Sequence, residues 1–583
     1  MIPLRTLGHR APLLWLVLPY LGGVAAAGHD PGLPPLPLLI AGFGAAAVSL
    51  LTAFIRPRLW AVFIVPGVAL AGYANCARFQ ALPPGWRNMP AREARLTLRI
   101  ERKFEPASLA PAVLKKPVPP RHSKKAAPRK PPPPRASGTG IVTDADRHLR
   151  DLIGQRIYYS LALRPGQGVP GQSAVVRADG VLEIVPRDAK EESFGAYLSG
   201  IGVNLRLGRG QLIELVRPQS AYREFCDALA ARMKGLLGAG LESRPDLLSV
   251  YRAMMMGWKQ DLTAEQKSAF LRTGTMHLFA INGLHIGVVA VALHALLALF
   301  RCPRPAAAAA ILFVLWLDVD TTGASPSAVR AFLMVCVFEG AHVLHRPANL
   351  IAALAAAALP VLLRDPMDLF GASFQMSYGV MAALATLGMP LAGWLQARFP
   401  ACPGVPAPLR SRFQRWRAAA QRHLLAALGI GIAASLVGAV SGVQFFGVLA
   451  PAGLPVGMIL APPAMLVIVC GFLSVLAGIS GGIVPGIPPG AHAPSRFLNG
   501  AASVLLRLIA AVVSAGLQIP GGNFTVHFRA SWIGPGALAA LIAVCMAGYA
   551  GRWRRGALRW WPPFIVLILA LVFGARFGVN SGR

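Results

Sequence analysis

Long apolar runs recur along most of this chain and constrain its fold more than any other feature. Of the 583 residues, 55% are hydrophobic and only 14% are charged. Runs of about 15–25 apolar residues can cross the hydrocarbon core of a bilayer as helices. A soluble protein of this length rarely has so few charges. The pattern predicts a polytopic α-helical membrane protein.

The positions of these runs predict about thirteen membrane spans. They lie at approximately 11–28, 37–55, 59–75, 277–300, 305–319, 326–344, 347–363, 369–395, 424–441, 444–479, 501–518, 532–549 and 561–576. The run 444–479 is too long for one span and contains Pro451, Pro455, Pro462 and Pro463. We therefore expect a broken or re-entrant piece there, followed by one full helix.

The distribution of arginine sets the expected orientation. Arg5 and Arg10 precede the first run, which has no convincing cleavage site after it and is interpreted as a retained helix. The first loop has no Lys or Arg, whereas basic clusters lie at 397–422 and 552–559. The positive-inside rule then places the N-terminus in the cytoplasm. It places the segment after Tyr73 and the C-terminus outside the cytoplasm.

Residues 76–220 follow the first three spans (residues 1–75) and are predicted to form an extracytoplasmic β-rich domain. Alternating segments at 96–100, 156–163 and 180–185 are separated by Gly/Pro turns, which favours a small barrel or sandwich. Residues 101–135 interrupt it with ten Lys or Arg, two Glu and ten Pro. Such a segment is expected to be disordered or polyproline-like. It either gathers nucleic acid by its charge or is an insertion without a role.

Residues 221–272 are predicted to be interfacial helices that lead into a membrane domain at 273–583. From 221 to about 240, apolar residues recur at helical spacing with basic residues around them. The seven cysteines show no metal-ligand spacing, so no metal or cofactor is expected. Cys76 and Cys226 flank the polar region and are candidates for a disulfide if that region lies outside the cytoplasm.

The segment Gly274–Gly287 places His277, Asn282 and His285 at and within the start of an apolar span. Unpaired polar groups in hydrocarbon cost several kcal/mol each, so a span that carries them usually faces a cavity or pathway. The alternative is that these histidines hydrogen-bond neighbouring helices.

Further polar segments follow the first one. Gly323–Met334 brings Arg330 into the start of a span, where it needs an anionic partner or must reach the surface. A further polar segment, 365–378, supplies Asp365, Asp368, Gln375 and Ser377, and Gln444-Phe-Phe-Gly447 opens the interrupted region.

Together these segments resemble the ComEC competence-protein family. The resemblance lies in Gly274-Thr-Met-His-Leu-Phe-Ala-Ile-Asn-Gly-Leu-His-Ile286, in Gly323–Met334 with its Ser-Pro-Ser-Ala-Val-Arg-Ala core, and in Asp365-Pro followed by Phe374-Gln-Met-Ser377. Phe194–Gly202 also resembles the end of the family's OB-like domain. The resemblance covers essentially the whole chain. It implies a bacterial inner-membrane channel that takes up single-stranded DNA during natural transformation.

The chain departs from the family pattern in two ways. Asn282 stands where the family usually has Ser, and no HxHxDH motif of a metallo-β-lactamase-like nuclease occurs among the twelve histidines. A separate nuclease is therefore expected if one strand is degraded. The resemblance also implies an ATP-driven helicase-like motor and a periplasmic DNA receptor. The arginine-rich loop 410–422 is either the motor's dock or a topology anchor.

Three functions are compared. As a DNA conduit within membrane lipids, the chain would line its path with His277, Asn282, His285, Arg330, Asp365, Gln375 and Ser377. Tyr158 and Tyr159 would either stack on bases or pack in a core. A membrane hydrolase using Ser325 or Ser377 is disfavoured because neither lies in a Gly-x-Ser-x-Gly elbow. A transporter of a lipid-linked or other anionic substrate remains the alternative. We expect a non-enzymatic DNA channel.

Overall fold

The computed structural model of the chain divides into two compact units. One consists of Leu18–Leu229 and Leu362–Gly371, and is called the barrel unit here; the other, the bundle unit, consists of Met1–Val17, Ala230–Val361 and Ala372–Arg583. The structure describes residues 11–30, 32–55, 59–83, 85–86, 89–104, 134–185, 193–279, 283–347, 349–402, 407–481, 493–551, 553 and 560–577.

Three apolar helices open the chain. They are α2 (Leu14–His29), α3 (Pro35–Ile55) and α4 (Trp60–Gln80). α2 and α4 cross with their backbones in contact, because a Cβ at Gly72 would lie 2.4 Å from the Tyr20 carbonyl oxygen. A Cβ at Gly23 would lie 1.9 Å from the Ala69 carbonyl oxygen. Only glycine permits this approach, as in other membrane helix pairs.

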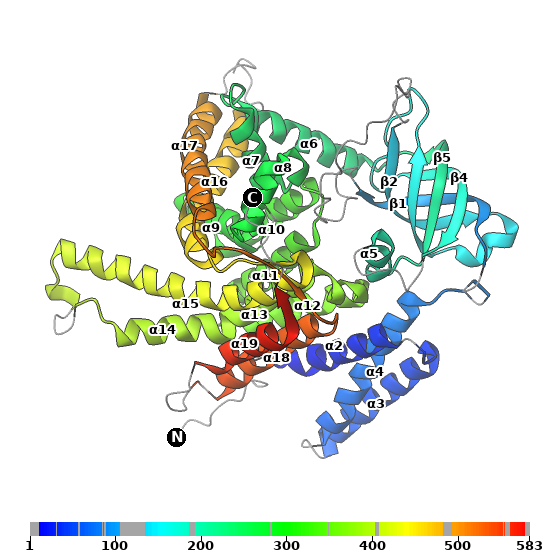
Figure 1. Cartoon of the computed structure of the whole chain (residues 1–583), viewed down its shortest axis with the longest axis horizontal. Coiled ribbons are helices and arrows are strands. Elements are labelled where there is room, and N and C mark those ends of the chain that lie inside the picture. The colour runs from blue at the N-terminus through cyan, green and yellow to red at the C-terminus, as the bar shows by residue number, and fades with distance from the viewer. Residues whose placement is uncertain are drawn as a thin grey trace. The chain divides into compact units, whose positions relative to one another are not determined.

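The predicted β-rich domain is a closed five-stranded barrel (Figure 1). Its strands are β1 (Arg92–Phe104), β2 (Arg135–Ala145), β3 (Arg156–Ala162), β4 (Val175–Ile184) and β5 (Leu205–Arg217). The order is β1-β2-β3-β5-β4, in which β3 and β5 are parallel and all other pairs are antiparallel. The three strands predicted from alternation are confirmed, while β2 and β5 were not predicted. Most of the basic insertion, residues 105–133, lies outside the described residues.

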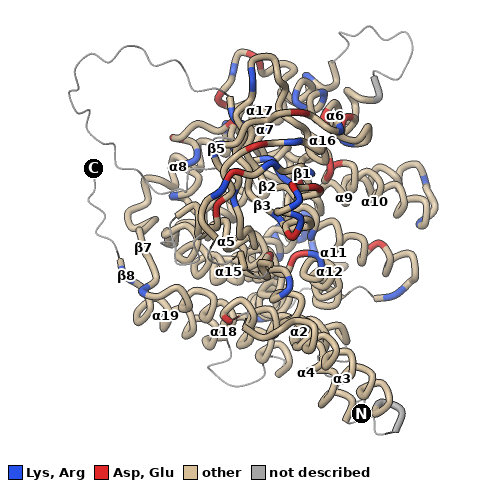
Figure 2. Tube along the Cα trace, turned by 90° about the vertical axis from the view of Figure 1, so that its right-hand side faces the viewer, with Lys and Arg blue, Asp and Glu red and all other residues tan. Residues whose placement is uncertain are grey.

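The barrel has an apolar core and a charged exterior. Leu98, Ile157, Leu161 and Leu207 are fully buried in that core. Tyr159 joins them, and burial raises the pKa of its hydroxyl above the usual value. Figure 2 shows Lys, Arg, Asp and Glu gathered along the barrel strands, while α3 and α4 are almost bare of charge.

The bundle unit contains most of the helices that were predicted to be interfacial and most of the apolar ones. They are α6 (Ala221–Gly238, whose first part belongs to the barrel unit), α7 (Pro245–Met256), α8 (Ala264–Arg272), α9 (Gly283–Leu299), α10 (Arg304–Thr321), α11 (Pro326–Val343), α12 (Leu350–Arg364), α13 (Ala372–Ala383), α14 (Met389–Arg398), α15 (Arg412–Phe446), α16 (Gly453–Gly481), α17 (Ala493–Leu517), α18 (Ile533–Ala550) and α19 (Pro562–Gly574). A π-helical turn, Leu384–Gly388, joins α13 to α14. β6 (Val448–Leu449), β7 (Phe524–Phe528) and β8 (Ala575–Phe577) form a small sheet in that order.

Eight helices among the described residues are long and apolar enough to cross a membrane, and four shorter apolar helices accompany them. The protein is therefore an integral multi-pass membrane protein. The count of thirteen spans and the orientation stay predictions. Helices also form in 221–272, as the apolar spacing predicted.

The predicted break in the run 444–479 lies near its start, and one full helix follows it. Residues 444–446 finish α15, Gly447 takes a left-handed conformation, and β6 follows. From Gly453 onward α16 is one continuous helix that contains Pro462 and Pro463. Proline is tolerated within membrane helices where neighbouring groups satisfy the freed carbonyls. The proline pair therefore does not end this helix.

The disulfide suggested for Cys76 and Cys226 is not formed. Both are free thiols, and both are almost completely buried. The Cys76 sulfur lies 3.5 Å from Nε2 of Gln80, one turn later on α4. Each cysteine is thus a small buried side chain that packs against its neighbours, which is common for free cysteine.

Candidate functional site

The Ser-Pro and Asp-Pro pairs of the sequence motifs are helix starts. Ser325 caps α11 by accepting a hydrogen bond from the Ala328 amide, and Pro326 opens the helix. Asp365 likewise accepts from the Met367 amide at 3.1 Å and is followed by Pro366. A capping oxygen followed by proline at the first helical position is a strong local signal for the start of a helix. Part of each motif therefore has a folding role.

Arg330 lies in the first turns of α11 and is enclosed, with 1% of its surface exposed. Its Nη2 donates hydrogen bonds to the carbonyl oxygen of Ser373 and, at 2.9 Å, to the Ser373 hydroxyl. The guanidinium lies 5.8 Å from the ring centre of Phe374 and 5.5 Å from that of Tyr378. Cation–π contacts of this kind gain strength when water is absent. The start of α13 thus holds the arginine of α11.

A pair of amides joins α13 to α15 beside this contact. Gln444 in the last turn of α15 donates from Nε2 to Oε1 of Gln375 at 3.2 Å. A Cβ added at Gly534, in the first turn of α18, would lie 2.8 Å from Oε1 of Gln444. We call Arg330, Ser373, Phe374, Gln375, Tyr378 and Gln444 the Arg330 site. It is built where α11, α13 and α18 begin and α15 ends.

The first sequence motif packs against the start of α16. Thr273 and Thr275 are buried with their hydroxyl oxygens 2.8 Å apart. Gly274, with φ of +70°, lies so close to the loop before α16 that a Cβ there would be 3.1 Å from the Cβ of Ala450. Glycine suits both the left-handed backbone and the close approach. Since β6 directly follows α15, this motif also lies near the end of the bundle at which α15 finishes.

The two motif histidines brace the backbone. The Nδ1 atom of His277 lies 3.2 Å from the Gly274 carbonyl oxygen. His285 is buried on α9, and its ring is hydrogen-bonded to the backbone of Met254 in α7. Asn282 lies outside the described residues. The His285 contact joins α9 to α7, as in the helix-bracing alternative, whereas this His277 contact is local.

Asp365 lies in the barrel unit and not in the Arg330 site. Its Oδ2 is 2.8 Å from Nη1 of Arg156 on β3, and Arg156 also pairs with Glu101 on β1 at 2.8 Å. The guanidinium lies 4.9 Å from the ring centre of Phe79 on α4. Burial lowers the pKa of Arg156, but the carboxylates of Asp365 and Glu101 outweigh it and keep that pKa above its usual value.

This arginine fastens the segment after α12 to the barrel. We call residues 362–371 the tether, because the chain continues from Gly371 directly into α13 and the Arg330 site. Asn75 also donates to the Leu363 carbonyl oxygen at 3.2 Å, and the Gln80 amide lies 3.2 Å from the Met367 sulfur. The sequence offered no signal for these partners, since Arg156 and Asp365 are 209 positions apart.

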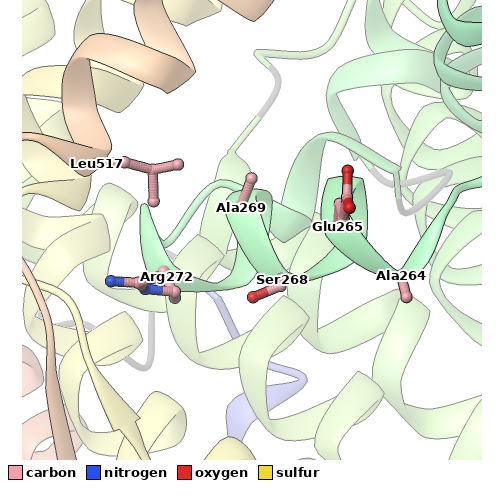
Figure 3. A pocket seen from close by; sticks show the side chains of 6 residues that line it. All are labelled: Ala264, Glu265, Ser268, Ala269, Arg272 and Leu517. Carbon is pink, nitrogen blue, oxygen red and sulfur yellow. The ribbon is translucent and has the colours of Figure 1, made fainter. Parts of the chain in front are cut away.

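Ser377 is the remaining predicted residue, and a described pocket is formed by α8 and α17. Ser377 is half-buried on α13, one turn beyond Ser373. A shallow pocket of about 390 Å³ is formed by Ala264, Glu265, Ser268, Ala269 and Arg272 of α8 with Leu517 of α17 (Figure 3). None of the predicted site residues lines it. Among the described residues no group of three His, Cys, Asp or Glu side chains is arranged to hold a metal ion.

Comparison with known proteins agrees with the motifs. A family model described as "Competence protein" matches residues 254–554. The chain is similar to ComE operon protein 3 of Bacillus subtilis (strain 168), with 31% identity over 140 residues, which is 24% of this chain and 18% of that protein. No solved structure matches. Because the family model spans more than half of the sequence, the chain belongs to the Competence protein family.

Proposed function

We propose that this protein conducts single-stranded DNA across the bacterial inner membrane during natural transformation. Membership of the Competence protein family supports a role in DNA uptake. The observation that carries the channel proposal is the enclosed Arg330, which lies where four helix ends meet. A buried arginine at membrane depth usually marks a transport pathway or a stabilised partner.

The proposed step is an exchange of partners at Arg330. In the present structure the guanidinium is held by Ser373 and by the rings of Phe374 and Tyr378. A strand can use it only when the starts of α11 and α13 separate, and a phosphate then takes the place of the Ser373 oxygens. Guanidinium matches phosphate geometry well, which favours this exchange.

The charge of the C-terminal part suits a polyanion. No Asp or Glu occurs after Asp368, whereas fifteen arginines do. Part of this excess anchors loops at the cytoplasmic face. The complete lack of carboxylates means that no like charge repels a phosphate backbone along this part of the chain.

We propose that the barrel is an OB-like domain that receives the strand. In OB folds the connections between the first two strands and between the last two bind oligonucleotides. Phe104 ends β1, and Tyr197 lies on α5 (Phe194–Gly200) between β4 and β5; their ring centres are 6.2 Å apart. Tyr197 is 53% exposed, whereas Tyr158 is 7% and Tyr159 1% exposed. We therefore propose that bases stack on Tyr197, whereas Tyr158 and Tyr159 pack in the core.

Several features of the proposed system follow from the family and the charge pattern. An ATP-driven helicase-like motor would pull the strand from the cytoplasm, a periplasmic receptor would deliver DNA to the barrel, and a separate nuclease would remove the other strand. The barrel and the C-terminus would lie outside the cytoplasm. We propose no catalytic activity for the chain itself.

Import of labelled DNA tests the channel in a strain deleted for this gene. We expect wild type to restore uptake and Arg330→Ala to reduce it. Hydrogen bonds to charged groups contribute about 1.5–3 kcal/mol, so the reduction should be on the order of tenfold or more. Arg330→Lys should lie between the two, because lysine keeps the charge and loses the fork of donors.

The matched control is Arg346→Ala, which removes an exposed arginine just beyond α11. Its uptake should equal that of wild type, and immunoblots of membranes should show equal amounts of all variants. Normal uptake by a well-expressed Arg330→Ala variant would contradict the phosphate role. Normal uptake in the deletion strain would contradict the channel and favour transport of a lipid-linked or other anionic substrate.

A further inference from the structure

A pair of ionisable side chains links α9 and α11 inside the bundle unit. Nε2 of His294 lies 2.7 Å from Oε1 of Glu339. Glu339 is 5% exposed, and its other oxygen is buried without a hydrogen-bond partner among the described residues. A carboxylate in such surroundings is expensive unless it is paired or protonated. This pair was not among the residues singled out from sequence.

The pair lies at the opposite end of the two helices from the Arg330 site. α9 begins within the first sequence motif, and Arg330 lies in the first turns of α11. His294 and Glu339 are only five and four residues before the ends of these helices at Leu299 and Val343. The His294–Glu339 pair therefore joins α9 and α11 near the ends opposite to those that carry the sequence motifs.

Other polar side chains lie near this pair, at the ends of the helices. The ring centres of His294 and His342 are 5.9 Å apart, and His342 is exposed in the last turn of α11. Beyond it, Nη1 of Arg304 donates to Nε2 of His345 at 2.8 Å. The imidazole rings of His342 and His345 are the groups here that can accept a proton near that face of the bundle.

The surrounding helices bring few other ionisable groups. α10 packs on both α9 and α11, α16 packs on α9, and α13 packs on α11. Besides His342, their ionisable residues, with those elsewhere on α9 and α11, are His285, Arg304, Asp318, Asp320, Arg330, Cys336, Tyr378 and Cys470. Of these, Cys336 lies one turn from Glu339 on α11, close enough to feel its charge.

We propose that His294 and Glu339 form a proton-binding site that regulates the contact between α9 and α11. The exchangeable proton resides on the imidazole, where Nε2–H faces the carboxylate in both states. With the proton bound, an imidazolium faces a carboxylate and the pair is neutral. With the proton released toward His342, a neutral imidazole donates to an isolated carboxylate, and the attraction falls.

The contact between α9 and α11 is therefore strongest while the pair holds its proton, and it weakens when the proton is released. Loosening one end of two packed helices shifts their other ends as well, because helices move as rigid elements. The proton on this pair thereby biases α11, which carries Arg330, and α9, which carries His285 of the first sequence motif. The inference concerns the helices and not their substrate, so it stands apart from the DNA proposal.

Distance measurement between spin labels tests the inference on the full chain in lipid nanodiscs. Labels replace the exposed Leu299 and Leu344 at the ends of α9 and α11, with the native cysteines removed. Between pH 5.5 and 8.5 we expect the mean distance to increase by on the order of 1–2 Å, or its distribution to widen. No DNA is present, so failure here leaves the channel proposal untouched.

Three variants decide the result. Glu339→Gln keeps a hydrogen-bond acceptor for His294 and removes the charge, so its distance should not respond to pH. His294→Gln should also be insensitive. His423→Asn removes an exposed histidine on α15 and should respond as the parent does. A parent protein without any pH response, or a Glu339→Gln variant that responds equally, would overturn the proposal and leave a purely structural hydrogen bond.

Discussion

Replacing Arg156 by methionine tests how the tether is held on the barrel. The change keeps the length of the side chain and removes its pairs with Glu101 and Asp365, both at 2.8 Å. Losing one partner of a fully buried pair costs about 3–5 kcal/mol, because the remaining charge is left without compensation. Since 20% of the Arg156 side chain is exposed, we expect about 2–3 kcal/mol.

Labelling of the Cys76 thiol measures this loss. The Gln80 amide bridges Cys76 and Met367 of the tether, so the completely buried thiol becomes reactive when the tether detaches. In a variant that keeps only this cysteine, the labelling rate follows the opening equilibrium when closing is fast. A change of about 2–3 kcal/mol then raises the rate roughly 30- to 150-fold in Arg156→Met.

A matched control distinguishes the tether from charge removal in general. Arg177→Met removes an exposed pair with Glu214 on the same barrel, and exposed pairs contribute about 0–1 kcal/mol. It should change the labelling rate by less than about fivefold. Asp365→Asn combined with Arg156→Met should be less than additive, because both remove one interaction. Equal labelling in Arg156→Met and the parent, or full additivity, would refute the reasoning.

Two further predictions concern packing between helices. Gly429→Ala in α15 should destabilise the detergent-solubilised protein by about 1–3 kcal/mol, because its Cβ would lie 2.7 Å from the Ala392 backbone nitrogen. Gly438→Ala in the same helix meets nothing within 4 Å and should leave the thermal transition unchanged or raised, so equal losses would contradict the packing argument. Asn499→Ala should cost about 2–3 kcal/mol, since the buried amide accepts from Tyr251 at 3.1 Å and donates to two backbone carbonyls. An unchanged melting temperature for this variant would show that water replaces the lost partners.

Apolar length predicted the membrane helices well because burial in lipid is a local requirement of each segment. α10 to α14, α18 and α19 lie within a few residues of the expected spans, whereas α9 begins about six residues later and α17 about eight residues earlier than expected. The continuity of α16 depends on its neighbours as well. Proline breaks a helix in water, but in α16 the pair Pro462 and Pro463 lies in a helix that packs along α17. Contacts between helices keep α16 continuous through its two prolines, and a single sequence does not show these contacts.

The site was predicted less completely than the fold. Polar residues in apolar runs indicated Arg330 and Gln375, and both take part in the Arg330 site. The partner residue Ser373 gave no signal, because a serine at a helix start resembles an ordinary cap. Asp365 was expected beside them but pairs with Arg156 of the barrel. Pairings across hundreds of residues depend on the fold, which the spacing of motifs does not reveal.

The length of α15 has a mechanical consequence. Its 35 residues extend about 50 Å, whereas the hydrocarbon core of a bilayer is about 30 Å thick. Roughly 20 Å of the helix must therefore stand clear of the lipid, and the exposed Phe413 and Trp416 lie on this outer part among the arginines. A capping box between Ser411 and Gln414 lets the helix begin in water without a neighbouring structure. α14 lies alongside it (Figure 1), and this contact stiffens the outer part of the helix.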